Sequence, residues 1–245
     1  MWIIADYQPT TLFSLRPATA TTSGGKSLIV PTPFAIKMAL LDVAVRTRGV
    51  QYAESFFPTL RDMRIAIDPP PQIVVNSTFT KILRIQEHKG KASEKAEKIV
   101  EAKSEQEWPF KKTIAYREYV QFVGPLQLGF EDVDFSLLVP LLLQVNYLGK
   151  RGGFLQLQAA PYQTEDLPSE FTEITESVGD SFPLGMLQQL DDFGPNITYE
   201  HANIYSGKTM RLGTHRILRP VILPYRMARS SRGYTLYERF DEARQ

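Results

Sequence analysis

The chain has 245 residues, a formal net charge of +1 at pH 7, three histidines and no cysteine. Its length is sufficient to bury a full hydrophobic core without crosslinks. The lack of cysteine excludes disulfides, Cys-based zinc sites and thiol nucleophiles, and three scattered histidines argue against a His-rich metal site. The longest apolar run, residues 137–143, is too short to span a bilayer, and the first residues lack a signal-peptide pattern. We therefore expect a soluble cytoplasmic protein with no metal, no cofactor and no membrane contact.

The charges are segregated in the C-terminal part of the chain. Residues 154–207 contain nine acidic residues and no Lys or Arg, whereas residues 208–237 contain seven basic residues and no Asp or Glu. Adjacent runs of opposite sign indicate different partners for different surfaces. The basic run suits a polyanion. The acidic run either binds a protein or neutralises the basic run within the molecule.

The N-terminal half predicts a strand at residues 2–7 and then a loop at residues 16–27. A helix follows at residues 35–48, with Thr32 as its N-cap, Pro33 in its first turn and Gly49 after its last turn. Because small and aliphatic residues recur at helical spacing along it, this helix should bury one face.

Two extended segments are predicted next, at residues 64–67 and 72–85, with a return strand at residues 113–128. The intervening residues, 88–112, favour a helix at 92–103 but contain few core residues. This composition predicts an insertion that protrudes from a hairpin tip, disordered until something binds it.

A second apolar helix is predicted at residues 137–148, with Pro140 in its first turn, and an alternating strand at residues 154–158. The resulting order is β-α-β-β-α-β, which is the ferredoxin-like or RRM arrangement. We predict an α+β fold in which residues 1–160 form this unit and residues 161–245 form a β-rich C-terminal extension packed on it.

A glycine-rich cationic turn, residues 149–153, joins the second helix to the last strand of this unit. Glycines let backbone N–H groups approach a phosphate, and two basic side chains add charge beside them. The alternative interpretation is a helix C-cap whose basic residues complement the helix dipole. Residues 225–237 similarly interleave arginines with tyrosines, which suits either a groove for a nucleic-acid strand or a solubilising segment.

Catalytic motifs are weak in this sequence. Residues 20–27 nearly match a P-loop, but prolines flank the segment where a strand and a helix are needed, so we expect no nucleotide hydrolysis. Lys26 could still contact phosphate. His215 lies in a basic neighbourhood and is the candidate acid or base for RNA 2′-OH chemistry, although a surface histidine is the simpler interpretation.

Taken together, the element order, the Lys150-Arg151-Gly152-Gly153 loop and the charged insertion resemble the RAMP superfamily of CRISPR proteins. The lead into the first helix, Val30-Pro31-Thr32-Pro33-Phe34, is similar to that of the CRISPR-associated "five" family within it. Some members of this family cleave precursor RNA with a small constellation of Tyr, Lys and His, and because the sequence shows no convincing counterpart we expect binding without cleavage. The resemblance implies a subunit that caps the 5′ handle of crRNA in a type I, Cascade-type complex. It further implies contacts with backbone and large subunits, indirect contact with target DNA, and a thumb at about residues 87–112 that lies against the neighbouring backbone subunit and the guide RNA.

The resemblance places the handle against the start of the first helix and the glycine loop. With the basic residues noted above, the predicted RNA-binding set is Lys26, Thr32, Lys37, Arg46, Arg48, Lys150, Arg151, Gly152, Gly153, Arg211, His215, Arg216, Arg226, Arg229 and Arg232. Two alternatives remain open. One is a metal-independent endoribonuclease that matures guide RNA with His215. The other is a scaffold protein that binds no nucleic acid and uses its acidic stretch, residues 165–200, to hold a partner.

Overall fold

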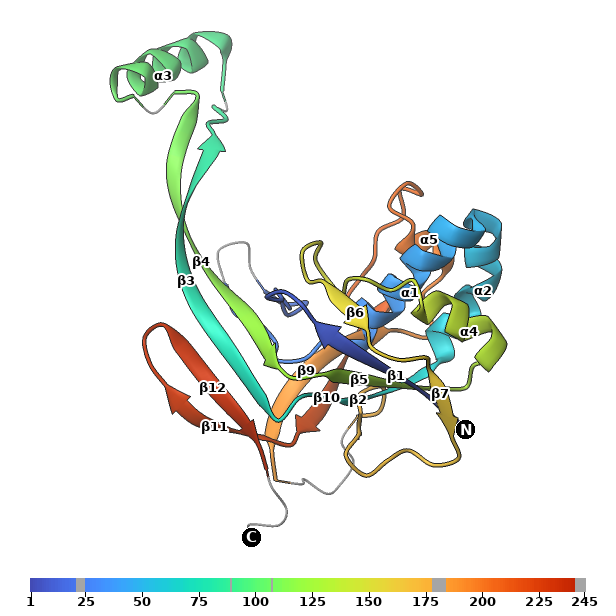
Figure 1. Ribbon diagram of the computed structural model, residues 1–245. Coiled ribbons are helices and arrows are strands. Elements are labelled where there is room, and N and C mark those ends of the chain that lie inside the picture. Colours follow the sequence, from blue (N-terminus) through green and yellow to red (C-terminus); the bar gives the residue numbers. More distant parts are fainter. Residues whose placement is uncertain (21–24, 89, 107, 178–183, 241–245) are drawn as a thin grey trace.

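The computed structural model describes residues 1–20, 25–88, 90–106, 108–177 and 184–240. Two antiparallel sheets and a two-stranded ribbon form a mixed α/β framework, and four of the five helices lie together beside the first sheet (Figure 1). The elements are β1 (Trp2–Pro9), α1 (Pro33–Arg48), α2 (Val50–Asp62), β2 (Arg64–Asp68), β3 (Gln72–Ile85), α3 (Ala92–Ser104), β4 (Phe110–Val123), β5 (Leu126–Glu131), α4 (Phe135–Leu142), β6 (Leu155–Leu157), β7 (Tyr162–Thr164), β8 (Thr172–Glu173), β9 (Met186–Phe193), α5 (Tyr199–Ala202), β10 (Arg216–Leu223), β11 (Tyr225–Ser230) and β12 (Tyr234–Arg239).

The first sheet has the strand order β6-β1-β5-β2-β8, and β7 also pairs with β1. Every pairing in it is antiparallel. Ile3, Ala5 and Tyr7 enter the main core, whereas Trp2 and Ile4 pack in a smaller cluster with Ala66, as expected for side chains that alternate between faces. The Tyr7 hydroxyl donates to the Leu142 carbonyl at 2.9 Å, which ties α4 to this sheet.

The first predicted helix is confirmed, including its cap. The Thr32 hydroxyl accepts a hydrogen bond from the Ala35 N–H at 3.2 Å, and Gly49 ends the helix with φ of 85°. α2 is absent from the sequence prediction, and it carries Pro58 in its interior, where a proline disfavours a helix. Burial of Phe56, Phe57 and Leu60 against the core outweighs that local cost.

The second predicted helix was misplaced. α4 begins at Phe135, where Asp134 accepts from the Ser136 N–H at 2.7 Å, and it ends at Leu142 rather than at residue 148. Pro140 therefore lies in the second turn. Its missing N–H and its ring favour an early end to the helix, so residues 143–148 are free to lead into a separate turn.

The second sheet has the order β11-β12-β3-β4 and forms a long arm that carries α3 at its tip (Figure 1). β3 and β4 pair without a break from Gln72↔Val123 to Ile85↔Phe110. The protruding unit is therefore longer than the predicted 87–112. The single return strand predicted at 113–128 is also wrong: Gly124, with φ of 128°, and Pro125 split it into β4 and β5, which belong to different sheets.

The C-terminal strands are divided among the first sheet, the ribbon and the second sheet. β9 and β10 make a ribbon whose Phe193 ring centroid lies 5.3 Å from those of both Phe34 and Phe57, whereas β11 and β12 widen the sheet of the arm. None of the helices within the described ranges is long and apolar enough to cross a membrane.

Asp6 gives this fold a testable pH dependence. Burial raises the pKa of its carboxyl above the ordinary value, and a hydrogen bond with Gln127 only partly opposes this. Because a raised carboxyl pKa favours the protonated form in the folded state, the contribution of Asp6 to stability is lost as the pH rises above about 3.8. Asp6→Asn should therefore raise the urea midpoint at pH 7 and change it little near pH 3.5. An equal change at both pH values would contradict this.

Candidate nucleic-acid interface

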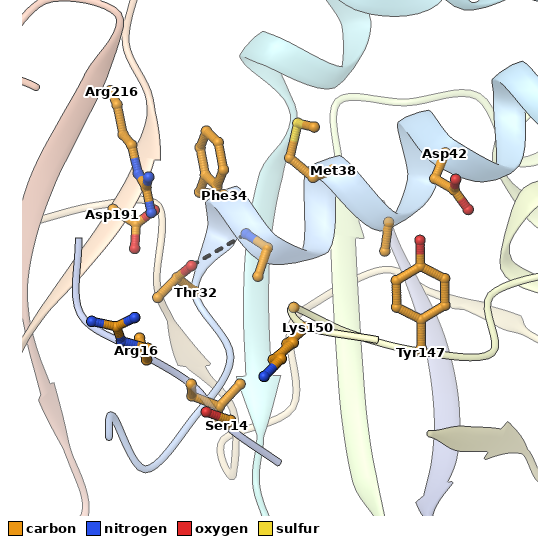
Figure 2. Close-up of a pocket in the computed structure, with 14 residues that line it drawn as sticks. Ser14, Arg16, Thr32, Phe34, Met38, Asp42, Tyr147, Lys150, Asp191 and Arg216 are labelled. Carbon is orange, nitrogen blue, oxygen red and sulfur yellow. Dashed lines mark hydrogen bonds and ion pairs between the residues drawn. The ribbon is translucent and has the colours of Figure 1, made fainter. Parts of the chain in front are cut away.

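A cavity of about 480 Å³ opens at the N-terminus of α1 (Figure 2). Four separate segments line it: the chain after β1, the start of α1, the glycine-rich turn and the β9–β10 ribbon. The lining residues are Ser14, Leu15, Arg16, Thr32, Phe34, Ala35, Met38, Ala39, Asp42, Tyr147, Gly149, Lys150, Asp191 and Arg216. Aromatic and aliphatic surface is thus combined with cationic groups, which is the composition that suits a nucleotide.

The first turn of α1 gives this pocket a partial positive charge. Thr32 uses its hydroxyl and carbonyl to accept from Ala35 and Ile36, at 3.2 and 3.1 Å. The Phe34 N–H donates to no acceptor among the described residues. An exposed N–H at the positive end of a helix dipole is a common anion-binding group. Thr32 therefore acts through the helix end that it caps, because its side chain is buried.

The glycine-rich turn is a hairpin turn and not a helix C-cap. The Leu148 N–H donates to the Gly153 carbonyl at 3.0 Å, and Tyr147 forms a bridge with Phe154. Gly149 and Gly152 have φ of 68° and 107°, a region that suits glycine. Lys150 and Arg151 are held exposed at the tip of this turn.

Gly153 does not join the expected phosphate cradle. It is buried, and its N–H donates to the Lys150 carbonyl at 3.1 Å, so this N–H is not available to a ligand. The predicted contact of Gly153 with RNA is corrected to a packing role.

Close packing at Gly153 can be tested by adding one methyl group. A Cβ there would lie 2.9 Å from both the Leu148 carbonyl oxygen and the Phe13 ring. We expect Gly153→Ala to lower the free energy of unfolding by about 1–3 kcal/mol, measured in urea. Gly233→Ala is the matched control, because a Cβ at Gly233 meets no atom within 4 Å. Equal effects of the two variants would contradict the packing role.

Arg216 is fixed at the far wall of the pocket. Asp191 accepts from its Nε at 2.6 Å, and the guanidinium carbon lies 4.1 Å from the centroid of the Phe34 ring. A guanidinium oriented by a carboxylate and an aromatic face is well placed to meet a phosphate or a base. The predicted residues Thr32, Lys150 and Arg216 therefore line one cavity (Figure 2).

Tyr147 closes the opposite side of the pocket. Burial raises the pKa of its hydroxyl, and the nearby Asp42 carboxylate raises that pKa further. Asp42 also accepts from the Arg46 Nε at 2.8 Å. Arg46 therefore orients a wall residue instead of facing the cavity. Arg48 is the last residue of α1, where its guanidinium lies 4.7 Å from the centroid of the Tyr52 ring, outside the pocket lining.

Lys37 must be removed from the predicted interface. Its side chain is only 1% exposed, and its Nζ lies 2.8 Å from Asp192 Oδ1 and donates to the Arg61 carbonyl at 2.9 Å. Burial lowers the pKa of the ammonium group, and the Asp192 carboxylate opposes that shift. A buried, paired lysine cannot reach a phosphate at the surface.

The remaining predicted residues lie on other surfaces. Lys26 forms an ion pair with Glu118 on β4 at 3.2 Å. Arg226 and Arg229 are on β11, and Arg232 is in the turn that follows it. Arg211 and His215 belong to the segment that leads into β10; the His215 ring stacks on His201 with 3.9 Å between centroids. Whether these residues contact RNA stays a prediction.

The opposite charge runs neutralise each other in part within the molecule. Asp191 and Asp192 are buried and pair with Arg216 and Arg219 across the β9–β10 ribbon, at 2.6 and 3.0 Å. Glu200 pairs with Lys208. Among the alternatives left open by the sequence, internal neutralisation thus accounts for this portion of the acidic run. No group of three or more His, Asp and Glu side chains in the described ranges is arranged to hold a metal ion.

The predicted set lacks most of the pocket lining, including Arg16, Phe34, Met38 and Tyr147. Phe34 and Met38 are four residues apart on α1 and so lie on one helix face, a spacing that could have paired them. Arg16 had no local signal, because only the tertiary fold brings the chain after β1 to the start of α1.

No family model matches the sequence. A curated protein from Archaeoglobus fulgidus, named CRISPR-associated protein Cas5, is 28% identical over 216 residues, which are 86% of this chain and 87% of that protein. The chain resembles Cas5. The resemblance to the "five" family expected from the sequence is thereby confirmed. A crystal structure of a CRISPR protein from Archaeoglobus fulgidus aligns with 98% of this chain and 92% of that chain, with a TM-score of 0.46 and 11% identity.

Proposed function

We propose that this chain is the non-catalytic subunit that binds the 5′ handle of crRNA in a type I CRISPR surveillance complex. The observation that carries the proposal is the α1 pocket, where a helix N-terminus, Lys150 and Arg216 converge on an aromatic cavity. Single-stranded RNA is bound by phosphate contacts and by bases stacked on aromatic rings. The similarity to a Cas5 protein supports the same assignment.

The proposed framework for this site is a ferredoxin-like unit. The four strands of this unit lie side by side in the order β6-β1-β5-β2, and all neighbours are antiparallel. If the four are numbered in chain order, this spatial order is 4-1-3-2. This is the order that a split βαβ arrangement produces. We divide the chain as before into this unit, residues 1–160, and a C-terminal part, residues 161–245, whose strands complete the pocket and the arm.

The arm formed by β3, β4 and α3 is proposed as the thumb. One of its faces carries Phe79, Leu83, Ile85, Phe110, Ile114 and Tyr116, which are 46–70% exposed. Large exposed apolar surfaces mark protein interfaces. We therefore expect this face, here called the inner face of the arm, to contact a backbone subunit beside the guide RNA.

The endoribonuclease alternative finds less support in the geometry of His215. Its Nδ1 accepts from the Arg211 N–H at 3.2 Å, so the neutral ring carries its hydrogen on Nε2. A ring in that tautomer lacks a free basic nitrogen for taking a proton from a 2′-OH group. Cleavage of a repeat hairpin by the purified chain, abolished in His215→Ala, would overturn the non-catalytic assignment.

The function is tested by purifying the tagged chain from its host and sequencing the RNA and proteins that accompany it. The proposal expects short guide RNAs with one shared 5′ end, together with repeated backbone subunits and a large subunit. Protein that is free of RNA and of those subunits would contradict it and favour a scaffold that binds no nucleic acid.

A further inference from the structure

The second sheet has two faces of different chemistry. Ile73 and Val75 of β3 and Val120 of β4 are buried in the main core, and they define the inner face at the root of the arm. Because side chains alternate along a strand, the residues between them point to the opposite side, here called the outer face. None of the principal contacts between described elements places another helix or strand on that face.

A row of two tyrosines and an asparagine crosses the outer face. Tyr234 of β12 is paired with Asn76 of β3, and Asn76 is paired with Tyr119 of β4. All three side chains are partly exposed. With neighbouring strands about 4.8 Å apart, the two tyrosines start roughly 10 Å from each other, with an amide between them. Two ring faces at this separation can receive two unpaired bases.

Basic residues flank this row on both sides. Arg229 is paired with Leu236, two residues from Tyr234, and Arg117 is paired with Thr78, two residues from Asn76. The basic residues in outer-face register on the four strands are Arg84, Lys111, Arg117, Arg226 and Arg229. Within these described strands, the acidic residue in the same register is Glu238. The Glu238 carboxylate accepts a hydrogen bond from the Gln72 side chain at 3.2 Å. Among the described residues, neither Arg226 nor Arg229 forms an ion pair.

The inner and outer faces of the arm differ in polarity. Beyond Ser77, the large apolar side chains with substantial exposure all fall in the inner-face register, from Phe79 to Ile85 and from Phe110 to Tyr116. The outer face instead presents Thr78, Thr80 and the half-buried Ile82 beside its arginines, and the inner face carries two exposed lysines, Lys81 and Lys112, among its apolar side chains. A polar, positively charged surface with isolated rings is poorly suited to a protein core and well suited to a polyanion with π-faces.

From this arrangement we infer that the outer face binds a single strand of nucleic acid, separate from the strand in the α1 pocket. Tyr119 and Tyr234 stack on two unpaired bases, and Asn76 hydrogen-bonds a base edge between them. Arg117 on one side, and Arg226 and Arg229 on the other, meet the phosphates. Four-stranded sheets with exposed rings bind unpaired bases in this manner. The inference does not depend on the proposed function, because stacking requires neither a handle sequence nor a complex.

The test uses the full chain with fluorescein-labelled oligo(dT) and oligo(U), which contain no handle, and fluorescence anisotropy across a salt series. Tyr119→Leu combined with Tyr234→Leu should weaken binding at least about tenfold without changing the salt slope. Arg226→Gln combined with Arg229→Gln should weaken binding and reduce the slope of log K against log salt by about 1.4, since each phosphate contact contributes about 0.7 on single strands.

Two matched variants separate stacking from loss of structure. Tyr116→Leu removes an exposed ring from the inner face of the same strand and should change affinity less than about twofold. The double Phe variant at Tyr119 and Tyr234 keeps both rings and should bind like the wild type. Weaker binding of oligo(dT), of oligo(U) or of both by the double Leu variant at Tyr119 and Tyr234 supports the inference. The probe that is affected tells whether the sheet accepts DNA, RNA or both. Failure of the wild type to bind either probe, an unchanged double Leu variant, or an equal loss in Tyr116→Leu would overturn it.

Discussion

Replacing Asp192 with asparagine should lower the free energy of unfolding by about 3–5 kcal/mol, because it leaves a buried charge without its counter-ion. The side chains of Lys37 and Asp192 are 1% and 2% exposed, and their charged atoms lie 2.8 Å apart. Asp192 also holds Arg219 at 3.0 Å. One carboxylate thus fixes the first helix to the β9–β10 ribbon, which forms the far wall of the pocket. Urea unfolding at neutral pH measures the effect.

Two further variants identify the buried charge as the cause. Lys37→Met combined with Asp192→Asn removes both members of the pair and should cost less than Asp192→Asn alone. Arg46→Gln breaks the exposed ion pair with Asp42 and should cost no more than about 0.5 kcal/mol. A loss below about 1 kcal/mol in Asp192→Asn would show that the pair does not hold the ribbon on α1.

The second large effect is expected in RNA affinity. Replacing Lys150 and Arg151 together with alanine should weaken binding of a crRNA handle at least about tenfold, since hydrogen bonds to charged groups each contribute about 1.5–3 kcal/mol. It should also lower the slope of log K against log salt by about 1.4. Both side chains are exposed at the tip of the hairpin turn, so the substitutions should leave the fold unchanged. Filter binding across a salt series measures both quantities.

The matched control removes two positive charges elsewhere. Lys208→Ala combined with Arg61→Ala lowers the net charge by two, as the Lys150 and Arg151 variant does. In the wild type, Lys208 pairs with Glu200 and Arg61 pairs with Asp62. This control should retain nearly all of the affinity. If the control and the Lys150 and Arg151 variant weaken binding equally, the effect would reflect total charge and not a site at the turn.

Local signals in the sequence predicted the elements that local chemistry determines. Thr32 and Gly49 mark the ends of α1 because a hydroxyl cap and a glycine with positive φ act within a few residues. The helix at the tip of the arm was likewise predicted within one residue, from helix propensity alone. The resemblance to the RAMP superfamily followed from the order of such elements, the glycine turn and the charged insertion, and the resemblance to the "five" family from the proline-rich lead into α1.

Long-range packing accounts for what the sequence did not reveal. Lys37 has the charge of an RNA ligand, and only its distant partner Asp192 makes it a core residue. The Gly124-Pro125 dipeptide is a local turn signal between β4 and β5 that the prediction of one return strand overlooked, whereas the assignment of the two strands to different sheets depends on their pairing partners. Arg16 reaches the pocket, and Tyr119 lines up with Tyr234, through contacts between segments that are far apart in the chain. No local pattern encodes such neighbours.

The most direct test of the central claim is a photo-crosslinking measurement on the assembled complex, with 4-thiouridine placed at single positions of the crRNA handle. Mass spectrometry of the digested protein would then locate the linked residues. A handle bound in the α1 pocket predicts crosslinks in the peptides that contain Phe34, Tyr147 and Lys150, or Arg216, which line that cavity. Crosslinks confined to other surfaces of the chain, or none from any handle position, would contradict the account.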